Sequence, residues 1–127
     1  MTVRRIVMNI AAPPGEDGAA FYRDLLGLDP LMDLGWITTW GVPADKPGAK
    51  TAAPQISVAS EGGSGAPVPD ISIEVDDVAA LWDRAQASGY ELPYPLTDEP
   101  WGVRRFMVRD PFGKLVNILA HSDGARG

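Results

Sequence analysis

The sequence predicts one α+β domain in which two βαβββ modules form a curved mixed sheet with helices on its convex side. Three observations lead to this fold class. The chain has 127 residues, which suits a single hydrophobic core. Short segments with alternating apolar and polar residues indicate strands. The order strand, helix, three strands occurs twice, and residues 19–22 (AAFY) and 79–82 (AALW) mark the two helices 60 positions apart.

The first module is expected over about residues 1–60. Ile6, Met8 and Ile10 alternate with less apolar neighbours and predict a strand whose apolar side faces a helix. That helix carries apolar residues at i, i+4 spacing and ends at Gly27. Two strands are predicted between residues 28 and 42, the second over 36–40 (WITTW), followed by a loop over 43–53 and a strand over 54–58.

The second module is expected over about residues 70–122, after a segment at 61–69 whose glycine, serine and proline content is typical of a flexible linker. A strict alternation over 70–75 predicts its first strand. Either Asp76 or Asp77 caps the helix that follows, and Gly89 ends it. Three further strands are predicted over 90–95, 103–109 and 115–120, the last two joined by a tight turn at 110–113 (DPFG).

Composition and charge exclude several classes of function. The 11 basic and 17 acidic residues give a formal net charge of −6, which argues against a nucleic-acid partner. The chain has no cysteine, so disulfides, thiolate metal sites and cysteine nucleophiles are excluded. Its single histidine, His121, excludes a site with two imidazoles from one chain. The apolar stretch near the N-terminus is too short for a signal peptide or a membrane span, so a cytoplasmic protein with no membrane partner is expected.

The alternation also assigns residues to the two faces of the predicted sheet. One face is apolar and is expected to cover the helices. The other face is mixed, and it is either an ordinary solvated face or the wall of a cavity. Tryptophans favour the cavity, because Trp36 and Trp40 share one parity with Thr38, Trp101 enters another strand, and such rings cover a ligand or a partner subunit. The mixed face is predicted to carry Arg5, Asn9, Gln55, Ser57, Asp70, Ser72, Glu74, Arg105, Met107 and Asn117.

Three segments carry a family resemblance and together span nearly the whole chain. They are residues 20–28 (AFYRDLLGL), 73–81 (IEVDDVAAL) and 100–113 (PWGVRRFMVRDPFG). In this order they resemble the vicinal oxygen chelate superfamily, the group of glyoxalases, bleomycin-resistance proteins and extradiol dioxygenases, whose domains are paired βαβββ modules. The resemblance implies metal-ligand positions that fall near Arg5, at Gln55 or Ser57, at Asp70 and at Asn117, none of which is a usual ligand of the family.

A chain without these ligands resembles the metal-free bleomycin-resistance branch of the family. That branch implies a homodimer that binds or sequesters a small organic molecule in a concave cavity, with no metal or other cofactor. His121 is expected to be an exposed residue near a frayed chain end. The ligand-binding residues implied are Asn9, Trp36, Trp40, Ser57, Asp70, Ser72, Glu74, Trp101, Arg105, Met107 and Asn117.

Two other functions stay open. The first is an enzyme of the same superfamily, a lyase, isomerase or dioxygenase, that uses a divalent metal, or a carboxylate base at Asp70 or Glu74 with Arg5 or Arg105 polarising the substrate. The second is a tryptophan-bearing face that serves only as a subunit interface. Glu74 and Arg105 are alternatively an ion pair with each other, which would carry no information about a ligand.

Overall fold

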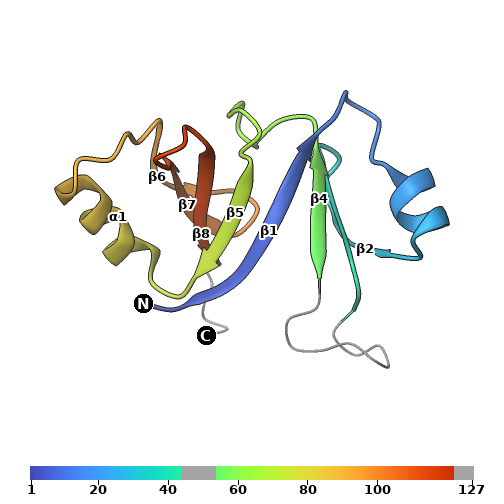
Figure 1. Ribbon diagram of the computed structural model, residues 1–127, viewed down its shortest axis with the longest axis horizontal. Helices are drawn as coiled ribbons and strands as arrows, with labels where there is room; N and C mark the ends of the chain where they lie inside the picture. The colour runs from blue at the N-terminus through green and yellow to red at the C-terminus, as the bar shows by residue number, and fades with distance from the viewer. Residues whose placement is uncertain (44–53, 122–127) are drawn as a thin grey trace. The chain divides into compact units, whose positions relative to one another are not determined.

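The computed structural model describes residues 1–43 and 54–121, and its contacts divide the chain into two compact units (Figure 1). Unit 1 comprises Met1–Ile6 and Pro69–Gly127, and unit 2 comprises Val7–Val68. The described residues form βαβββ twice, which confirms the α+β class. None of their helices has the length and apolar character of a membrane span. The elements are β1 (Val3–Ala11), η1 (Ala20–Leu25), β2 (Asp29–Asp33), β3 (Ile37–Gly41), β4 (Gln55–Ala59), β5 (Ile71–Val75), α1 (Val78–Ala87), β6 (Tyr94–Glu99), β7 (Val103–Arg109) and β8 (Leu115–His121).

Unit 1 is a mixed sheet with a helix on one face. Its strands follow the order β1-β5-β8-β7-β6, with β5 parallel to β8, and with β7 antiparallel to both β8 and β6. The helix α1 packs through Leu81 and Trp82 on the face that carries Val75, Phe106 and Ile118 (Figure 1). The predicted alternation is therefore confirmed for this unit, because the apolar side chains meet the helix and leave the opposite face to polar ones.

The start of α1 decides between the two predicted caps. Asp77 is the cap, since its Oδ1 accepts the N–H of Ala80 at 3.1 Å. Asp76 instead accepts the backbone N–H of Thr2 at 2.8 Å, and this hydrogen bond lowers the pKa of the Asp76 carboxyl. The two neighbouring aspartates thus have different roles: Asp77 caps the helix, and Asp76 bonds to the backbone of Thr2 near the start of the chain.

Unit 2 is a second mixed sheet, in the order β2-β3-β4-β1, with β1 parallel to β4 and the other pairs antiparallel. Its helix differs from α1. The helix η1 is a single π-type turn beside β2, in which the N–H of Leu26 donates to the carbonyl of Phe21, five residues earlier, at 3.1 Å. None of the residues of η1 is buried. The helix η1 therefore does not give this unit the covered apolar face that α1 gives unit 1.

The apolar side of β1 is where the sequence prediction is wrong. Ile6 and Met8 were expected to face a helix, yet they are 63% and 58% exposed, whereas Val7 between them is buried. Alternation identifies residues that share a side of a strand, but it does not identify the element that covers that side. With η1 beside β2, these side chains are uncovered in the described part of the chain.

Two predicted segments also need correction. The strand expected over 90–95 instead runs over Tyr94–Glu99, later in the chain than the alternation predicted. Residues 61–69 form a hydrogen-bonded turn instead of a flexible linker, with the N–H of Gly62 donating to the carbonyl of Ala66 at 2.7 Å. Only glycine fits at position 62, since a Cβ there would collide with the Pro67 carbonyl. Positions 44–53 of the predicted loop lie outside the described residues.

Candidate functional site

The face of unit 1 opposite α1 gathers polar side chains from several strands. Pairing places Ser72 of β5 beside Asn117 of β8, and Asn117 beside Met107 of β7. Residues two positions further along each strand lie on the same side. We call this surface the polar face of unit 1, and it consists of Arg5, Ser72, Glu74, Glu99, Arg105, Met107, Asn117 and His121.

Glu74 is the centre of a charge cluster on this face. Its Oε1 accepts the Nε–H of Arg5 at 2.9 Å, and its Oε2 lies 3.0 Å from Nδ1 of His121. An ionised carboxylate only accepts hydrogen bonds, so a neutral imidazole donates to it from Nδ1 and keeps Nε2 as an acceptor. Glu74 is largely buried, with its side chain 17% exposed, whereas the imidazole is 47% exposed. His121 is exposed, as predicted, and its strand position also brings its Nδ1 to Glu74, a contact that the sequence analysis did not predict.

Asn117 provides an unmatched acceptor on the same face. The residue is 7% exposed, and its Nδ2 donates to Ser72 Oγ at 3.2 Å. Its Oδ1 is buried and has no hydrogen-bond partner within the described residues. A buried acceptor left unsatisfied costs about 1–3 kcal/mol of stability. Because this oxygen is buried, a group outside the chain can bond to it only if neighbouring side chains move aside.

Arg105 is held inside unit 1. Its Nε–H donates to Glu99 Oε2 at 2.7 Å, and both side chains are 3% exposed. Tyr94 donates its hydroxyl to the same oxygen at 2.6 Å. The guanidinium also lies 4.8 Å from the ring centroid of Tyr94 and 5.0 Å from that of Trp101. The alternative of an ion pair between Arg105 and Glu74 is therefore wrong, because each of them pairs with a different residue.

Two more of the predicted residues in unit 1 have clear surroundings. Asp70 precedes β5, and its Oδ2 accepts the N–H of Leu115 at 2.8 Å, which joins the starts of β5 and β8. Met107 is fully buried beside Asn117. Ligand contacts at these two positions, and at the half-buried Trp101, remain predictions.

The predicted residues of unit 2 are divided between two faces of its sheet. Asn9 and Thr39 flank Ser57 in the strand pairing, and the hydroxyls of Thr39 and Ser57 are 2.8 Å apart. Trp40 pairs instead with Ile56, on the opposite face. The expectation that the tryptophans of this strand share a face with Asn9 and Ser57 is therefore wrong. Parity within one strand does not determine its register against the next strand.

Trp36 and Trp40 also differ in exposure. Trp40 is 1% exposed, and its Nε1–H donates to the carbonyl of Asp17 at 2.8 Å, so its ring packs inside unit 2. Trp36 is partly exposed and lines a pocket together with Thr38. Of the two rings, only that of Trp36 is open to a ligand in this unit.

The residues at the positions implied by the family resemblance do not fit a divalent metal. At the first position, Arg5 places a guanidinium against Glu74, and a cation there repels a metal ion. Ser57 is bonded to Thr39, and Asp70 is bonded to a backbone N–H. Across residues 1–43 and 54–121, no group of three or more His, Cys, Asp or Glu side chains is arranged to hold a metal ion.

Sequence reasoning missed Glu99 of the polar face and its hydrogen-bond partner Tyr94. The strand expected over 90–95 ends before Glu99, so the prediction placed Glu99, the partner of Arg105, in a loop. The available signal was the acidic pair Asp98 and Glu99, followed closely by the arginines of the predicted strand 103–109. A buried arginine requires a carboxylate partner, and that requirement would have brought Glu99 into the strand.

The comparisons with known proteins agree with the fold. The family model described as Glyoxalase/Bleomycin resistance protein/Dioxygenase superfamily matches residues 7–118. No curated protein sequence matches the chain. Among solved structures, a superfamily member from Vibrio splendidus 12B01 has a TM-score of 0.56 at 17% identity, covering 94% of this chain and 99% of that one.

Two further structures extend the range of similar proteins. The NAD-dependent benzaldehyde dehydrogenase structure from Legionella pneumophila has a TM-score of 0.67 at 14% identity, covering 91% of this chain and 98% of that one. The Mn(II)-bound glyoxalase from Novosphingobium aromaticivorans has a TM-score of 0.54 at 20% identity, covering 93% of this chain and 38% of that one. At such identities the likeness shows the fold alone. The family model spans most of the sequence, and the chain therefore belongs to the glyoxalase, bleomycin-resistance protein and dioxygenase superfamily.

Proposed function

We propose that the chain binds a small organic molecule, in the cytoplasm and without a metal, on the polar face of unit 1. The observation that carries the proposal is the buried Oδ1 of Asn117, which lacks a partner among the described residues. A ligand that displaces the side chains over this oxygen and carries an N–H or O–H donor satisfies the acceptor and removes the cost of leaving it unpaired. Ser72 beside it and the imidazole Nε2 of His121 further along β8 offer additional polar contacts.

The enzyme alternative has less support from the groups on this face. Both oxygens of Glu74 are engaged, one by Arg5 and one by His121, and Asp70 accepts a backbone N–H. Arg105 is enclosed with Glu99 and has little access to a substrate. A carboxylate base needs an oxygen that reaches the substrate proton. His121 is the group on this face best placed for proton transfer, through its Nε2.

The variant Asn117→Leu tests the binding proposal. It replaces the amide, with its free acceptor and its donation to Ser72, by a larger branched apolar side chain, so we expect at least a tenfold loss of ligand affinity, and urea unfolding measures the cost of fitting the larger side chain. The ligands are found by screening planar cationic metabolites for tryptophan quenching, and both variant and wild type are then titrated and unfolded in urea. Gln86→Leu, which removes an exposed amide on α1, is the matched control and keeps full affinity. Full affinity in Asn117→Leu would contradict the proposal.

The metal-free part of the proposal has its own measurement. After dialysis against metal-free buffer, plasma mass spectrometry is expected to find far less than one Zn, Mn, Ni or Fe per chain. A stoichiometric metal would overturn that part even if Asn117→Leu behaves as expected.

We also propose that the protein is a homodimer that buries the apolar side chains left uncovered in unit 2. Met8 and Leu25 are 58% and 69% exposed, and Phe21 and Leu26 are exposed as well. Monomeric proteins rarely leave so many large apolar side chains uncovered close together in sequence. Association with a second copy covers them, and symmetric dimers are the commonest solution.

Light scattering at micromolar concentration checks the dimer. The wild type is expected at twice the 13.5 kDa mass of one chain, and the double variant Met8→Glu/Leu25→Glu at the monomer mass. The control Phe112→Glu changes an exposed apolar residue in the β7–β8 turn and remains dimeric. A monomeric wild type would refute the proposal.

A further inference from the structure

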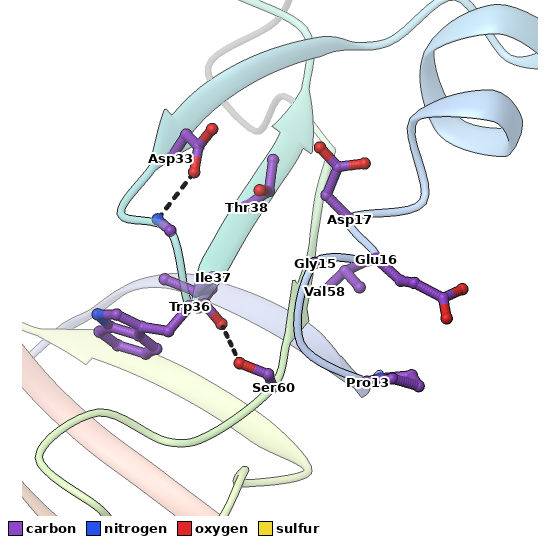
Figure 2. A pocket seen from close by; sticks show the side chains of 11 residues that line it. Pro13, Gly15, Glu16, Asp17, Asp33, Trp36, Ile37, Thr38, Val58 and Ser60 are labelled. Atoms are coloured by element: carbon purple, nitrogen blue, oxygen red, sulfur yellow. Dashed lines mark hydrogen bonds between the residues drawn. The ribbon is translucent and has the colours of Figure 1, made fainter.

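Unit 2 contains a pocket on the face of β3 that carries Thr38, away from Asn9 and Ser57. Its volume is about 160 Å³, enough for a small functional group but not for a drug-sized molecule. The walls come from the loop before η1, from the β2–β3 turn and from β3 and β4 (Figure 2). The strand register fixes one wall, because Thr38 pairs with Asp33 on one side and with Val58 on the other. The pocket is therefore built from paired strands and one loop within a single unit.

The lining of this pocket is strongly acidic. It includes Glu16, Asp17 and Asp33, and no lysine or arginine. Asp33 Oδ1 accepts the N–H of Gly35 at 2.9 Å, and Asp17 Oδ1 accepts the N–H of Ala19 at 3.0 Å, so backbone contacts orient both carboxylates. The second oxygen of each has no partner within the described residues. Figure 2 shows these two carboxylates on either side of Thr38, whereas that of Glu16 points away from them.

Thr38 is a second polar group at the pocket, separate from the carboxylates. The residue is only 4% exposed and lines the pocket, yet its hydroxyl has no hydrogen-bond partner among residues 1–43 and 54–121. Its neighbour Thr39, on the other face, is bonded to Ser57. Most buried side-chain polar groups in proteins are hydrogen-bonded. The Thr38 hydroxyl therefore faces the pocket, where it can exchange hydrogen bonds with a bound group.

We infer that this pocket binds the cationic end of a small organic molecule, a primary ammonium or a guanidinium group. The carboxylates of Asp17 and Asp33 supply the opposite charge and the Thr38 hydroxyl accepts one N–H. Trp36 is also among the residues that line the pocket, and its indole extends away from Thr38 and Asp17 (Figure 2). Apolar contact with Val58 and Ile37 favours an alkyl chain next to the charge over a hydrated metal ion. The site is separate from the polar face of unit 1 and does not depend on the function proposed there.

An NMR titration with three probes of equal chain length tests the inference. Butylammonium and butylguanidinium carry the proposed cations, and butan-1-ol is their uncharged match. Either cation is expected to shift the indole N–H signal of Trp36, which the variant Trp36→Phe identifies among the four tryptophans, and the amide signals of Gly35 and Thr38. Butan-1-ol is expected to shift them less than one tenth as much at the same concentration. Comparison of the two cations shows which group binds more tightly.

Three variants separate this site from a general effect of negative charge. Asp33→Asn is expected to weaken cation binding about tenfold, and its amide oxygen can still accept the Gly35 N–H, so the turn is retained. Thr38→Val, which keeps the shape and removes the hydroxyl, is expected to weaken binding severalfold. Asp83→Asn removes the same charge from the exposed face of α1 and is expected to leave binding unchanged.

Several outcomes would overturn the inference. One is a chemical-shift response to butan-1-ol equal to that of the cations, which would show that the pocket binds the alkyl chain and not the charge. Another is a loss of affinity in Asp83→Asn equal to that in Asp33→Asn, which would show that cation binding depends on the net charge of the protein and not on this pocket. Full affinity in both Asp33→Asn and Thr38→Val, with folding verified by the remaining amide signals, would show that the residues assigned to the site do not contribute to binding.

Discussion

Glu99→Ala is expected to lower the free energy of unfolding by about 3–5 kcal/mol, the typical cost of removing one partner from a buried ion pair. The carboxylate accepts hydrogen bonds from both Arg105 and Tyr94, and the Arg105 side chain that would be left behind is 3% exposed. Without Glu99, a guanidinium remains buried with its charge uncompensated on that side. Urea unfolding followed by circular dichroism measures the difference between variant and wild type.

A surface pair in the same two strands is the matched control for Glu99→Ala. Asp98 pairs with Arg104 at 3.1 Å, and both side chains are well exposed. Asp98→Ala is therefore expected to change the free energy of unfolding by about 0–1 kcal/mol. The double variant Glu99→Leu/Arg105→Met, which replaces the buried pair with apolar side chains, is expected to recover most of the loss. A loss in Glu99→Ala no larger than that in Asp98→Ala would contradict our description of the buried pair.

Phe106→Ala is expected to have an effect of similar size, about 3–5 kcal/mol, for a different reason. The ring is 1% exposed in the core of unit 1, and it packs edge-on against Trp82 of α1 with ring centroids 5.2 Å apart. Its removal leaves a cavity under the helix and deletes the aromatic contact. Urea unfolding gives the loss of stability, and the near-ultraviolet circular dichroism of Trp82 reports the loosened packing.

The control for Phe106→Ala is another phenylalanine six positions later. Phe112 lies in the turn between β7 and β8 and is 85% exposed. Phe112→Ala is expected to change the free energy of unfolding by no more than about 0.5 kcal/mol. Equal losses at the two positions would mean that the core of unit 1 is not where the structure places it.

The second half of the fold was predictable because its local signals agree with one another. Residues 70–75 alternate strictly, Asp77 caps the helix, and the apolar residues of α1 meet the apolar side of the sheet. In the first half, alternation in β1 was equally clear, but the short π-type turn η1 does not cover it. The sequence pattern indicates which residues share one side of a strand. It does not indicate which element packs on that side, because packing depends on tertiary contacts.

For the candidate site, the sequence predicted which side chains share a face of the sheet, but not which of them form hydrogen bonds or ion pairs with each other. The residues Ser72, Glu74 and Asn117 lie on one face as their parity requires. Their contacts depend on strand register and on the true limits of each strand, which brought His121 to Glu74 and Glu99 to Arg105. For the same reason Trp40 was assigned to the wrong face, because its strand pairs with β4 in a register that counting within one strand does not give.

The division of β1 between the two units has a consequence for the order of folding during synthesis. Unit 2 is a continuous stretch, Val7–Val68, whereas unit 1 combines Met1–Ile6 with the chain from Pro69 onward. During synthesis, every residue of unit 2 therefore leaves the ribosome before residues 69 onward, with which the first six residues pack. Those residues join unit 1 only by closing a loop of more than sixty residues, a contact of high sequence separation that slows folding.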